Sequence, residues 1–358
     1  MEPRILFIRL SALGDIINTL PALSAYRLER PEASVDWVVE DRFADLLRLV
    51  EGVDRVIVFP RRKIGPTSAG ISAFGRHLRG LRERRYDAAI DFQGNLKGAL
   101  HLRCSVAAQR IGLVRSASRE GAHWFADTRV RPPAGCHRVA RALALIEPVC
   151  PGAGGSLRDG VLDAALLPVI RDDPEAAREV QERLAKLDPG AGPLVILHPG
   201  TSSFGTFKRW PAANFAVLAR AIAKEHAARV LVPHGQGEQD LAREVASGSG
   251  GRAVSWSPSR GLAGLVALLR RADLVVAADS GPLLLASALG VRTVALFGPK
   301  NPAVYAPVFG DCRVVRGLAP CSPCSLRRCE DPVCMSGISP EQVLAAVREQ
   351  LRRDPIRA

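Results

Sequence analysis

The alternation of short apolar runs with amphipathic segments constrains the fold of this chain more than any other feature. Residues 4–9 are mostly apolar, as in a buried strand, and residues 16–30 have a helical pattern. The strand pattern returns at residues 35–39, 55–59 and 88–92. Strands that alternate with helices form βαβ units, whose strands run parallel. The first half of the chain therefore predicts an α/β fold with a parallel sheet.

The second half repeats this alternation, with strands predicted at residues 194–197, 228–232, 274–277 and 291–297. Pro, Gly and Ser cluster in residues 148–160, between the two halves. A chain of 358 residues is also longer than one hydrophobic core usually supports. We therefore expect two Rossmann-like domains. Their predicted bounds are residues 1–160 and 161–338, followed by a C-terminal helix and tail at residues 339–358.

The formal net charge of +13 is concentrated in one part of the chain. Residues 55–147 contain 18 Arg and Lys against 6 Asp and Glu, a net charge of +12. This cluster includes Arg61, Arg62 and Lys63 and favours an anionic partner, with a solvated surface as the alternative. Nucleic acid is not expected, because the segment has few aromatic residues and no nucleic-acid-binding motif. A phosphorylated lipid or sugar fits the charge better.

The sequence carries no sign of export or of a membrane span. The apolar run at residues 5–10 already contains Arg9 and is shorter than the core of a signal peptide. No segment has the roughly 18 apolar residues that a transmembrane helix needs. We therefore expect a cytoplasmic protein whose thiols are reduced.

Four of the eight cysteines gather near the C-terminus, with the spacing C-x2-C-x4-C-x4-C. They are Cys321, Cys324, Cys329 and Cys334. This spacing differs from the paired C-x2-C knuckles that identify a structural zinc site. A thiol-rich loop without metal is therefore the expected structure, and a bound metal is the alternative.

Ligands of open parallel sheets bind beyond the carboxyl ends of the strands, so the residues that follow each strand are the candidates for chemistry. Gly14 and Asp15 follow the first predicted strand. A carboxylate at this edge can act as a general base that takes a proton from an acceptor hydroxyl. The alternative is an N-cap, in which Asp15 only accepts hydrogen bonds from backbone N–H groups.

The first strand of the second half runs into residues 198–200, which are followed by Thr201 and Ser202 and, farther on, by Lys208. Small and hydroxyl residues beside a helix start, with a lysine in reach, predict a phosphate cradle. A solvent-exposed loop with a structural His198 is the alternative. It explains Lys208 and the hydroxyl groups less well.

Two further strands of the second half are followed by polar residues. Glu238 can accept hydrogen bonds from ribose hydroxyls, or it can be an acid in the first turn of a helix. Asp279, Ser280 and Gly281 open another helix, whose free N–H groups suit a diphosphate or belong to a simple cap. No Walker loop, HExxH or GxSxG motif is present, which argues against P-loop kinases, zincins and α/β-hydrolases.

Taken together, these segments resemble the ADP-heptose:lipopolysaccharide heptosyltransferases of glycosyltransferase family 9. The resemblance spans nearly the whole chain. Each motif alone is weakly specific, but the motifs in this order along the chain are quite specific. The motifs are residues 10–15 (LSALGD), 19–23 (TLPAL), 91–97 (DFQGNLK), 198–200 (HPG), 208–210 (KRW) and 279–282 (DSGP).

The resemblance implies a GT-B fold, in which two Rossmann-like domains with parallel sheets face an interdomain cleft. It implies that the N-terminal domain binds the acceptor and the C-terminal domain binds the ADP-sugar, with inversion and without a metal or other cofactor. Asp15 matches the general base, Lys208 a contact to the donor diphosphate, and Glu238 a contact to the nucleoside. Thr201, Ser202, Asp279, Ser280 and Gly281 complete the expected donor site.

The acceptor site is expected in the basic first half. Arg119 matches a segment that meets acceptor phosphate, and the other expected contacts are Arg61, Arg62, Lys63, Gln93 and Lys97. One residue departs from the family pattern, which places a histidine three residues after the donor-loop glycine. That position is Leu284 here.

The leading hypothesis is an inverting transferase that moves heptose from ADP-heptose to a lipopolysaccharide inner-core acceptor (Kdo/heptose-lipid A), with peripheral contact at the inner face of the cytoplasmic membrane. Two alternatives are a family member with another donor or surface-glycan acceptor and a non-catalytic glycan- or nucleotide-binding homologue, against which the intact Asp15 argues. A nucleotide-sugar epimerase would leave the basic region without a role. Neither glycine loop has the spacing of a dinucleotide site.

Overall fold

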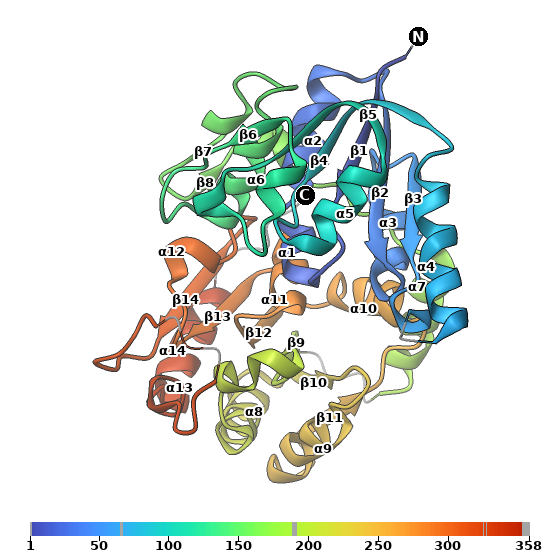
Figure 1. The fold of residues 1–358 in the computed structure, drawn as a ribbon. Coiled ribbons are helices and arrows are strands. Elements are labelled where there is room, and N and C mark those ends of the chain that lie inside the picture. Colours follow the sequence, from blue (N-terminus) through green and yellow to red (C-terminus); the bar gives the residue numbers. More distant parts are fainter. Residues whose placement is uncertain (1, 65–66, 188–191, 325, 327, 353–358) are drawn as a thin grey trace. The chain divides into compact units, whose positions relative to one another are not determined.

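The computed structural model describes residues 2–64, 67–187, 192–324, 326 and 328–352, and the chain forms two compact units. Unit 1 is Met1–Arg171 and unit 2 is Asp172–Ala358 (Figure 1). The division lies later than the predicted boundary at residue 160. Residues 169–171 remain with unit 1 because their backbone pairs with the segment after α3: the N–H of Glu51 bonds to the carbonyl of Val169 at 2.9 Å, and that of Arg171 to the carbonyl of Leu49 at 2.7 Å.

Unit 1 is built on a six-stranded parallel sheet of order β3-β2-β1-β4-β5-β6. The order reverses direction between β1 and β4, where Ile8 and Asp91 are register partners. The strands are β1 (Arg4–Ile8), β2 (Ser34–Glu40), β3 (Arg55–Phe59), β4 (Arg85–Asp91), β5 (Val106–Leu113) and β6 (Thr128–Val130). The helices are α1 (Leu13–Ile17), α2 (Leu20–Glu29), α3 (Ala44–Leu49), α4 (Ser68–Gly80), α5 (Leu96–Cys104) and α6 (Arg138–Ile146).

Unit 2 repeats this topology with the strand order β11-β10-β9-β12-β13-β14, also parallel (Figure 1). Its strands are β9 (Leu194–His198), β10 (Arg229–Pro233), β11 (Ala253–Trp256), β12 (Leu274–Ala278), β13 (Thr293–Phe297) and β14 (Cys312–Arg316). Its helices are α7 (Pro174–Ala185), α8 (Ala212–His226), α9 (Gln239–Gly248), α10 (Gly261–Leu269), α11 (Gly281–Ala288), α12 (Pro302–Tyr305), α13 (Val333–Ser336) and α14 (Pro340–Arg352).

The remaining elements are short. A two-stranded antiparallel hairpin, β7 (Leu157–Arg158) and β8 (Val161–Leu162), lies at the end of the Pro-, Gly- and Ser-rich residues 148–160 and just after them. The 3-10 helices are Asp41–Phe43, Arg61–Lys63, Arg115–Ala117, Ala122–Phe125, Ala153–Gly155, Ala164–Leu166 and Ser203–Lys208. Every helix within the described ranges is too short or too polar to cross a bilayer.

The inner strands of unit 2 are buried along their whole length because helices cover both faces of the sheet. All five residues of β9, of β12 and of β13 are buried. Helix α14 belongs to the same core, since Val343 and Val347 join the cluster formed by β9 and α8. Residues 340–352 of the predicted tail are therefore part of unit 2, and residues 353–358 lie outside the described residues.

The predicted helix over residues 16–30 is two helices, α1 and α2. Pro21, which has no N–H group to donate, lies in the first turn of α2, where such a group has no helical partner. The hydroxyl of Thr19 donates to the carbonyl of Asp15 at 2.8 Å and fixes the junction. The sequence analysis did not predict the outer strands β5, β6, β11 and β14, because they are only partly covered and contain polar residues.

Two phenylalanines of unit 2 allow a matched test of the core. Phe215 on α8 is fully buried, 4.8 Å from the ring of Trp210, whereas Phe204 is 87% exposed. We expect Phe215→Ala to lower the free energy of unfolding by about 3–5 kcal/mol. Phe204→Ala should change it by less than about 0.5 kcal/mol. Urea denaturation followed by circular dichroism measures both, and equal losses would contradict this packing.

Candidate active site

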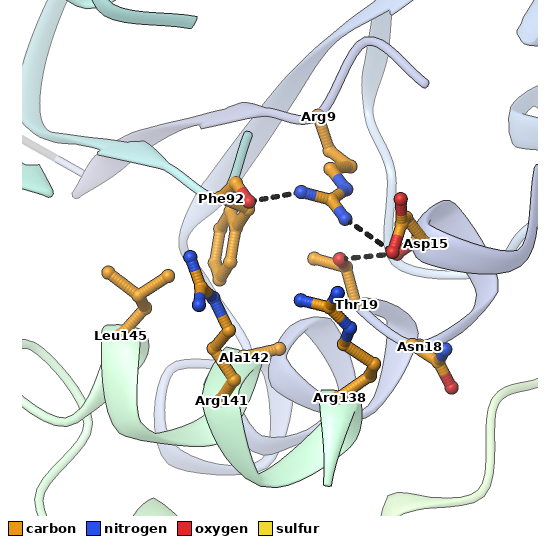
Figure 2. Close-up of a pocket in the computed structure, with 9 residues that line it drawn as sticks. All are labelled: Arg9, Asp15, Asn18, Thr19, Phe92, Arg138, Arg141, Ala142 and Leu145. Atoms are coloured by element: carbon orange, nitrogen blue, oxygen red, sulfur yellow. Dashed lines mark hydrogen bonds and ion pairs between the residues drawn. The ribbon is translucent and has the colours of Figure 1, made fainter. Parts of the chain in front are cut away.

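Asp15 is held by an arginine from the end of the central strand of unit 1. Arg9 directly follows β1, and its Nη2 lies 2.8 Å from Oδ1 of Asp15 (Figure 2). Nη1 of Arg9 donates to the carbonyl of Phe92, which directly follows β4. The guanidinium therefore joins the two strand ends and orients the carboxylate. The Asp15 side chain is 37% exposed, so an incoming group can reach it.

The N-cap interpretation of Asp15 is wrong. The N-cap of α1 is Ala12, whose side chain has no acceptor, and Asp15 lies within the first turn. Its carboxylate is directed to Arg9 rather than to the helix N–H groups. A carboxylate that is oriented and still accessible is suited to accept a proton.

Two more arginines surround Asp15 in a small cavity of about 20 Å³, enough for one water-sized group. Figure 2 shows Arg138 and Arg141 projecting from α6, where their spacing of three places them on one face. Nη2 of Arg141 donates to the carbonyl of Ala117 at 2.7 Å. The pKa of Arg141 is lowered, first by burial and then by the charge of Arg138. The full lining is Arg9, Asp15, Asn18, Thr19, Phe92, Arg138, Arg141, Ala142 and Leu145.

This arginine pocket is the functional feature that the sequence analysis missed. Arg138 and Arg141 were counted in the basic cluster, but nothing in the sequence separates them from its surface arginines. Their spacing of three was the one local signal, and it gains meaning only when the fold brings α6 to the cavity that Arg9 and Asp15 also line. Three guanidinium groups around one carboxylate favour an anionic ligand.

Asp91 and Gln93 support the loop that carries Asp15. Asp91 is buried at the end of β4 and accepts the N–H groups of Gln93 at 2.9 Å and Gly94 at 3.1 Å. Oε1 of Gln93 accepts the N–H groups of Leu10 at 3.1 Å and Ser11 at 3.2 Å. Gln93 was predicted to contact the sugar acceptor. In the structure its side-chain oxygen holds the β1–α1 loop.

The other predicted acceptor residues lie outside the arginine pocket. Nζ of Lys97 lies 3.8 Å from Oε1 of Glu40, a buried carboxylate at the end of β2. Arg119 is exposed, and its backbone N–H bonds to the carbonyl of Gly94 at 2.9 Å, which anchors it beside the loop after β4. The remaining three, Arg61, Arg62 and Lys63, form the exposed 3-10 helix that follows β3. Four of these five residues follow the carboxyl end of a strand, and the fifth, Arg119, lies beside the loop after β4.

In unit 2, Lys208 and Asp279 form the central ion pair of the predicted donor site. Nζ of Lys208 donates to Oδ2 and to the carbonyl of Asp279, both at 2.8 Å. The pair joins the loop after β9 to the end of β12. Next to it, Ser280 is the N-cap of α11, and its buried Oγ has no hydrogen-bond partner among the described residues. Gly281 is the first residue of α11, so its N–H is one of the unpaired groups at this helix start.

Glu238 follows β10 and packs closely against Gly200 at the end of β9. A Cβ at Gly200 would lie 2.2 Å from Oε1 of Glu238, so only glycine permits this approach. Oε2 of Glu238 accepts the N–H of Gly235 at 3.1 Å. His198 is buried and its Nδ1 lies 3.2 Å from the carbonyl of Pro233, so Nδ1–H is the donor. Burial lowers the pKa of His198, which agrees with the structural role considered for it.

Thr201 and Ser202 differ, although both were predicted to bind the donor. Thr201 is buried, and its hydroxyl donates to the carbonyl of Gly205 at 3.0 Å and accepts from Nε of Arg209 at 3.2 Å. The hydroxyl of Thr201 is thus engaged in shaping the loop, whereas Ser202 is exposed. Leu284, the departure from the family pattern, is 4% exposed and lies one turn into α11.

The late cysteines vary in exposure. Cys321 is exposed, Cys324 and Cys329 are half-buried, and Cys334 is buried. Across the described ranges, no three or more His, Cys, Asp or Glu side chains are placed to hold a metal ion together.

The burial of Asp91 generates a prediction about pH. Burial raises the pKa of Asp91 to about 6, against the opposing effect of the Gly94 and Gln93 N–H groups. Because the folded-state pKa lies above the unfolded one, Asp91 contributes stability below about pH 4 that is lost as the pH rises through about 6. Asn at this position cannot titrate but can still accept both N–H bonds. We therefore expect Asp91→Asn to become more stable relative to the unmodified protein between about pH 4 and about pH 6.

Urea denaturation at several pH values measures this difference. Asp45→Asn is the control, since Asp45 is an exposed acid paired with Arg48. A stability difference for Asp91→Asn that does not change with pH would contradict the raised pKa.

Comparison with known proteins identifies the family. The model described as glycosyltransferase family 9 (heptosyltransferase) matches residues 74–333. Lipopolysaccharide heptosyltransferase 1 of Pseudomonas aeruginosa is 33% identical, and the match covers 97% of this chain and 98% of that protein. The protein of the same name from Escherichia coli K12 is 28% identical, with 84% and 89% covered.

The fold agrees with this relationship. The structure described as E. coli heptosyltransferase WaaC with ADP superimposes with a TM-score of 0.75 at 25% identity, covering 97% of this chain and 99% of that one. The predicted α/β class, with two Rossmann-like units of GT-B type, is confirmed. The chain belongs to glycosyltransferase family 9, the heptosyltransferase family.

Proposed function

We propose that this glycosyltransferase moves a heptose from ADP-heptose to an inner-core lipopolysaccharide acceptor (Kdo/heptose-lipid A), with inversion at the anomeric carbon. The observation that carries the proposal is the accessible Asp15 carboxylate, oriented by Arg9 inside a pocket of arginines. The names of the relatives support it, since those from P. aeruginosa and E. coli are lipopolysaccharide heptosyltransferases. A solved relative is described as E. coli heptosyltransferase WaaC with ADP.

In the proposed reaction, Asp15 is the general base. The acceptor hydroxyl gives its proton to the carboxylate as its oxygen forms a bond to the anomeric carbon of the donor sugar. The bond from that carbon to the phosphate oxygen breaks, and its electron pair leaves with ADP. Arg9 fixes the orientation of the base, and such positioning is worth much of the rate enhancement in a displacement of this kind.

The arginine pocket suits an acidic acceptor. Arg138 and Arg141 lie beside the base and can attract a carboxylate or phosphate toward the reacting hydroxyl; the volume of about 20 Å³ admits one oxygen of such a group rather than the whole group. Arg61, Arg62, Lys63, Lys97 and Arg119 are proposed to meet further anionic groups of the acceptor. The acceptor is a lipid, so the same basic surface can contact anionic headgroups in a peripheral association with the membrane.

The donor is proposed to bind at the carboxyl edge of the unit 2 sheet. We propose that Lys208 and the start of α11, with Ser280 and Gly281, hold the diphosphate and that Glu238 accepts from the ribose; the ion pair of Lys208 with Asp279 and the unpaired groups at the helix start support this. Charge on the departing ADP is then offset by groups of the chain itself, so the proposal includes no metal or other cofactor.

Asp15→Asn tests the proposed reaction. It keeps the shape of the side chain and removes the base, so we expect transfer to fall by at least about 100-fold while calorimetry still detects ADP binding. The assay uses ADP-heptose and a Kdo-lipid A acceptor. Asp45→Asn, which alters an exposed acid of the same unit, is the control and should keep full activity.

Full activity of Asp15→Asn would refute the role of the base. If the unmodified protein binds ADP but transfers no sugar, the non-catalytic homologue is favoured. Leu284, which stands where the family pattern has a histidine, is the sequence feature that points to this alternative.

Gly200→Ala tests the nucleoside site. The added Cβ would meet Oε1 of Glu238 at 2.2 Å and displace the carboxylate. We expect the dissociation constants of ADP and of adenosine to rise together by about tenfold, because both contain the ribose. The control is Gly75→Ala, where the new Cβ would meet nothing within 4 Å apart from its chain neighbours and the backbone of its own helix. Unchanged affinity in Gly200→Ala would remove Glu238 from the nucleoside site.

A further inference from the structure

A cavity of about 790 Å³ opens in unit 2 beside Lys208. This volume is within the range of small-molecule sites, roughly 300–1,000 Å³. Its lining contains three cationic side chains, those of Lys208, Lys300 and Arg328, and no acidic residue. The other lining residues are Ser202, Phe204, Gly205, Thr206, Phe207 and Leu326.

The three cations differ in their partners. Lys208 is paired with Asp279, which compensates much of its charge. Nζ of Lys300 bonds to the carbonyl of Leu326 at 3.4 Å and lies 5.4 Å from the ring centre of Phe207. In the part of the chain that the structure describes, neither Lys300 nor Arg328 forms an ion pair with a carboxylate. Two cations that share one cavity without an acidic partner attract an anion.

The segment that contains Cys321, Cys324 and Cys329, called here the cysteine-rich segment, contributes Leu326 and Arg328 to the lining of this cavity. Lys300 follows β13 by two residues, Gly298 and Pro299. The N–H of Cys324 bonds to the carbonyl of Pro299 at 2.8 Å, and the hydroxyl of Ser322 donates to the carbonyl of Gly298. These bonds fasten the segment to the loop after β13 and thereby bring Leu326 and Arg328 to the side of Lys300.

The order of the strands places this cavity relative to the donor site. Glu238, Lys208, Asp279 and Lys300 follow β10, β9, β12 and β13, which are neighbours in that order. A nucleotide whose ribose meets Glu238 and whose diphosphate lies at Lys208 and Ser280 continues toward β13. The cavity therefore receives the end of the diphosphate from which the sugar departs.

We propose that Lys300 and Arg328 bind the β-phosphate of the nucleotide donor and stabilise it as the leaving group, an inference that rests on the proposed function. When the bond from the anomeric carbon to the β-phosphate oxygen breaks, its electron pair stays on that oxygen and the phosphate gains negative charge. The acceptor proton goes to Asp15 in the same displacement. Lys208 is already opposed by Asp279, so the additional charge needs further cations.

The test compares nucleotides that differ only in the β-phosphate. Lys300→Ala, Arg328→Ala and the double variant are titrated calorimetrically with ADP and with AMP. We expect the ADP dissociation constant to rise at least tenfold in the double variant, and the AMP constant to change less than threefold. With ADP-heptose, kcat should fall by a larger factor than KM rises, because the charge develops in the transition state.

Arg243→Ala is the matched control, since Arg243 is an exposed arginine of α9 paired with Asp240 and lies outside the cavity lining. Unchanged circular dichroism and thermal unfolding show that each variant is folded. Equal loss of ADP and AMP binding, or no loss of either, overturns this inference while ADP binding by the unmodified protein upholds the donor site. No ADP binding by the unmodified protein overturns the proposed function and this inference with it.

Discussion

Burial of both faces of each parallel sheet is the constraint on which the rest of the structure depends. The central strands β9 and β12 of unit 2 are buried from end to end, and a charged side chain there would lose its hydration without a partner. An unpartnered polar group is therefore best placed where a strand ends and the chain turns into the next helix, whereas the buried Asp36 inside β2 is paired with the hydroxyl of Tyr86. Asp15, Lys208, Glu238 and Asp279 all occupy such positions, and so does Lys300.

In both units a cationic side chain joins the ends of two neighbouring central strands. In each, a cation after the first strand reaches across to the end of the neighbouring strand in the middle of the sheet: Arg9 bonds to Phe92 after β4, and Lys208 bonds to Asp279 after β12. The outcome differs with the position of the acid. In unit 1, Arg9 also orients Asp15 and leaves it accessible. In unit 2, Asp279 partly compensates the positive charge of Lys208, so further positive charge for an anionic ligand has to come from the surrounding loops.

Positive charge is distributed differently in the two units. Unit 1 carries most of the excess, and part of it converges on the base through Arg138 and Arg141 of α6. Unit 2 carries 23 Arg and Lys against 18 Asp and Glu, a net charge of +5. Two of its cations, Lys300 and Arg328, meet at one cavity because the segment that contains the late cysteines is bonded to the loop after β13. That segment thus has a structural role that its cysteine spacing did not indicate.

The sequence by itself determined the α/β class, the two-domain organisation, the family and the motif positions of Asp15, Lys208, Glu238 and Asp279, because strand periodicity and short motifs are local properties of the chain. Only the tertiary structure decided that Arg9 holds Asp15 and that α6 brings Arg138 and Arg141 beside it. It also decided that Thr201 bonds within its own loop, whereas Gln93 holds the β1–α1 loop. It also moved the domain division to Arg171, through backbone bonds between segments more than a hundred residues apart in sequence. Such pairings depend on which strand ends become neighbours, and that is fixed by the packing of the whole unit.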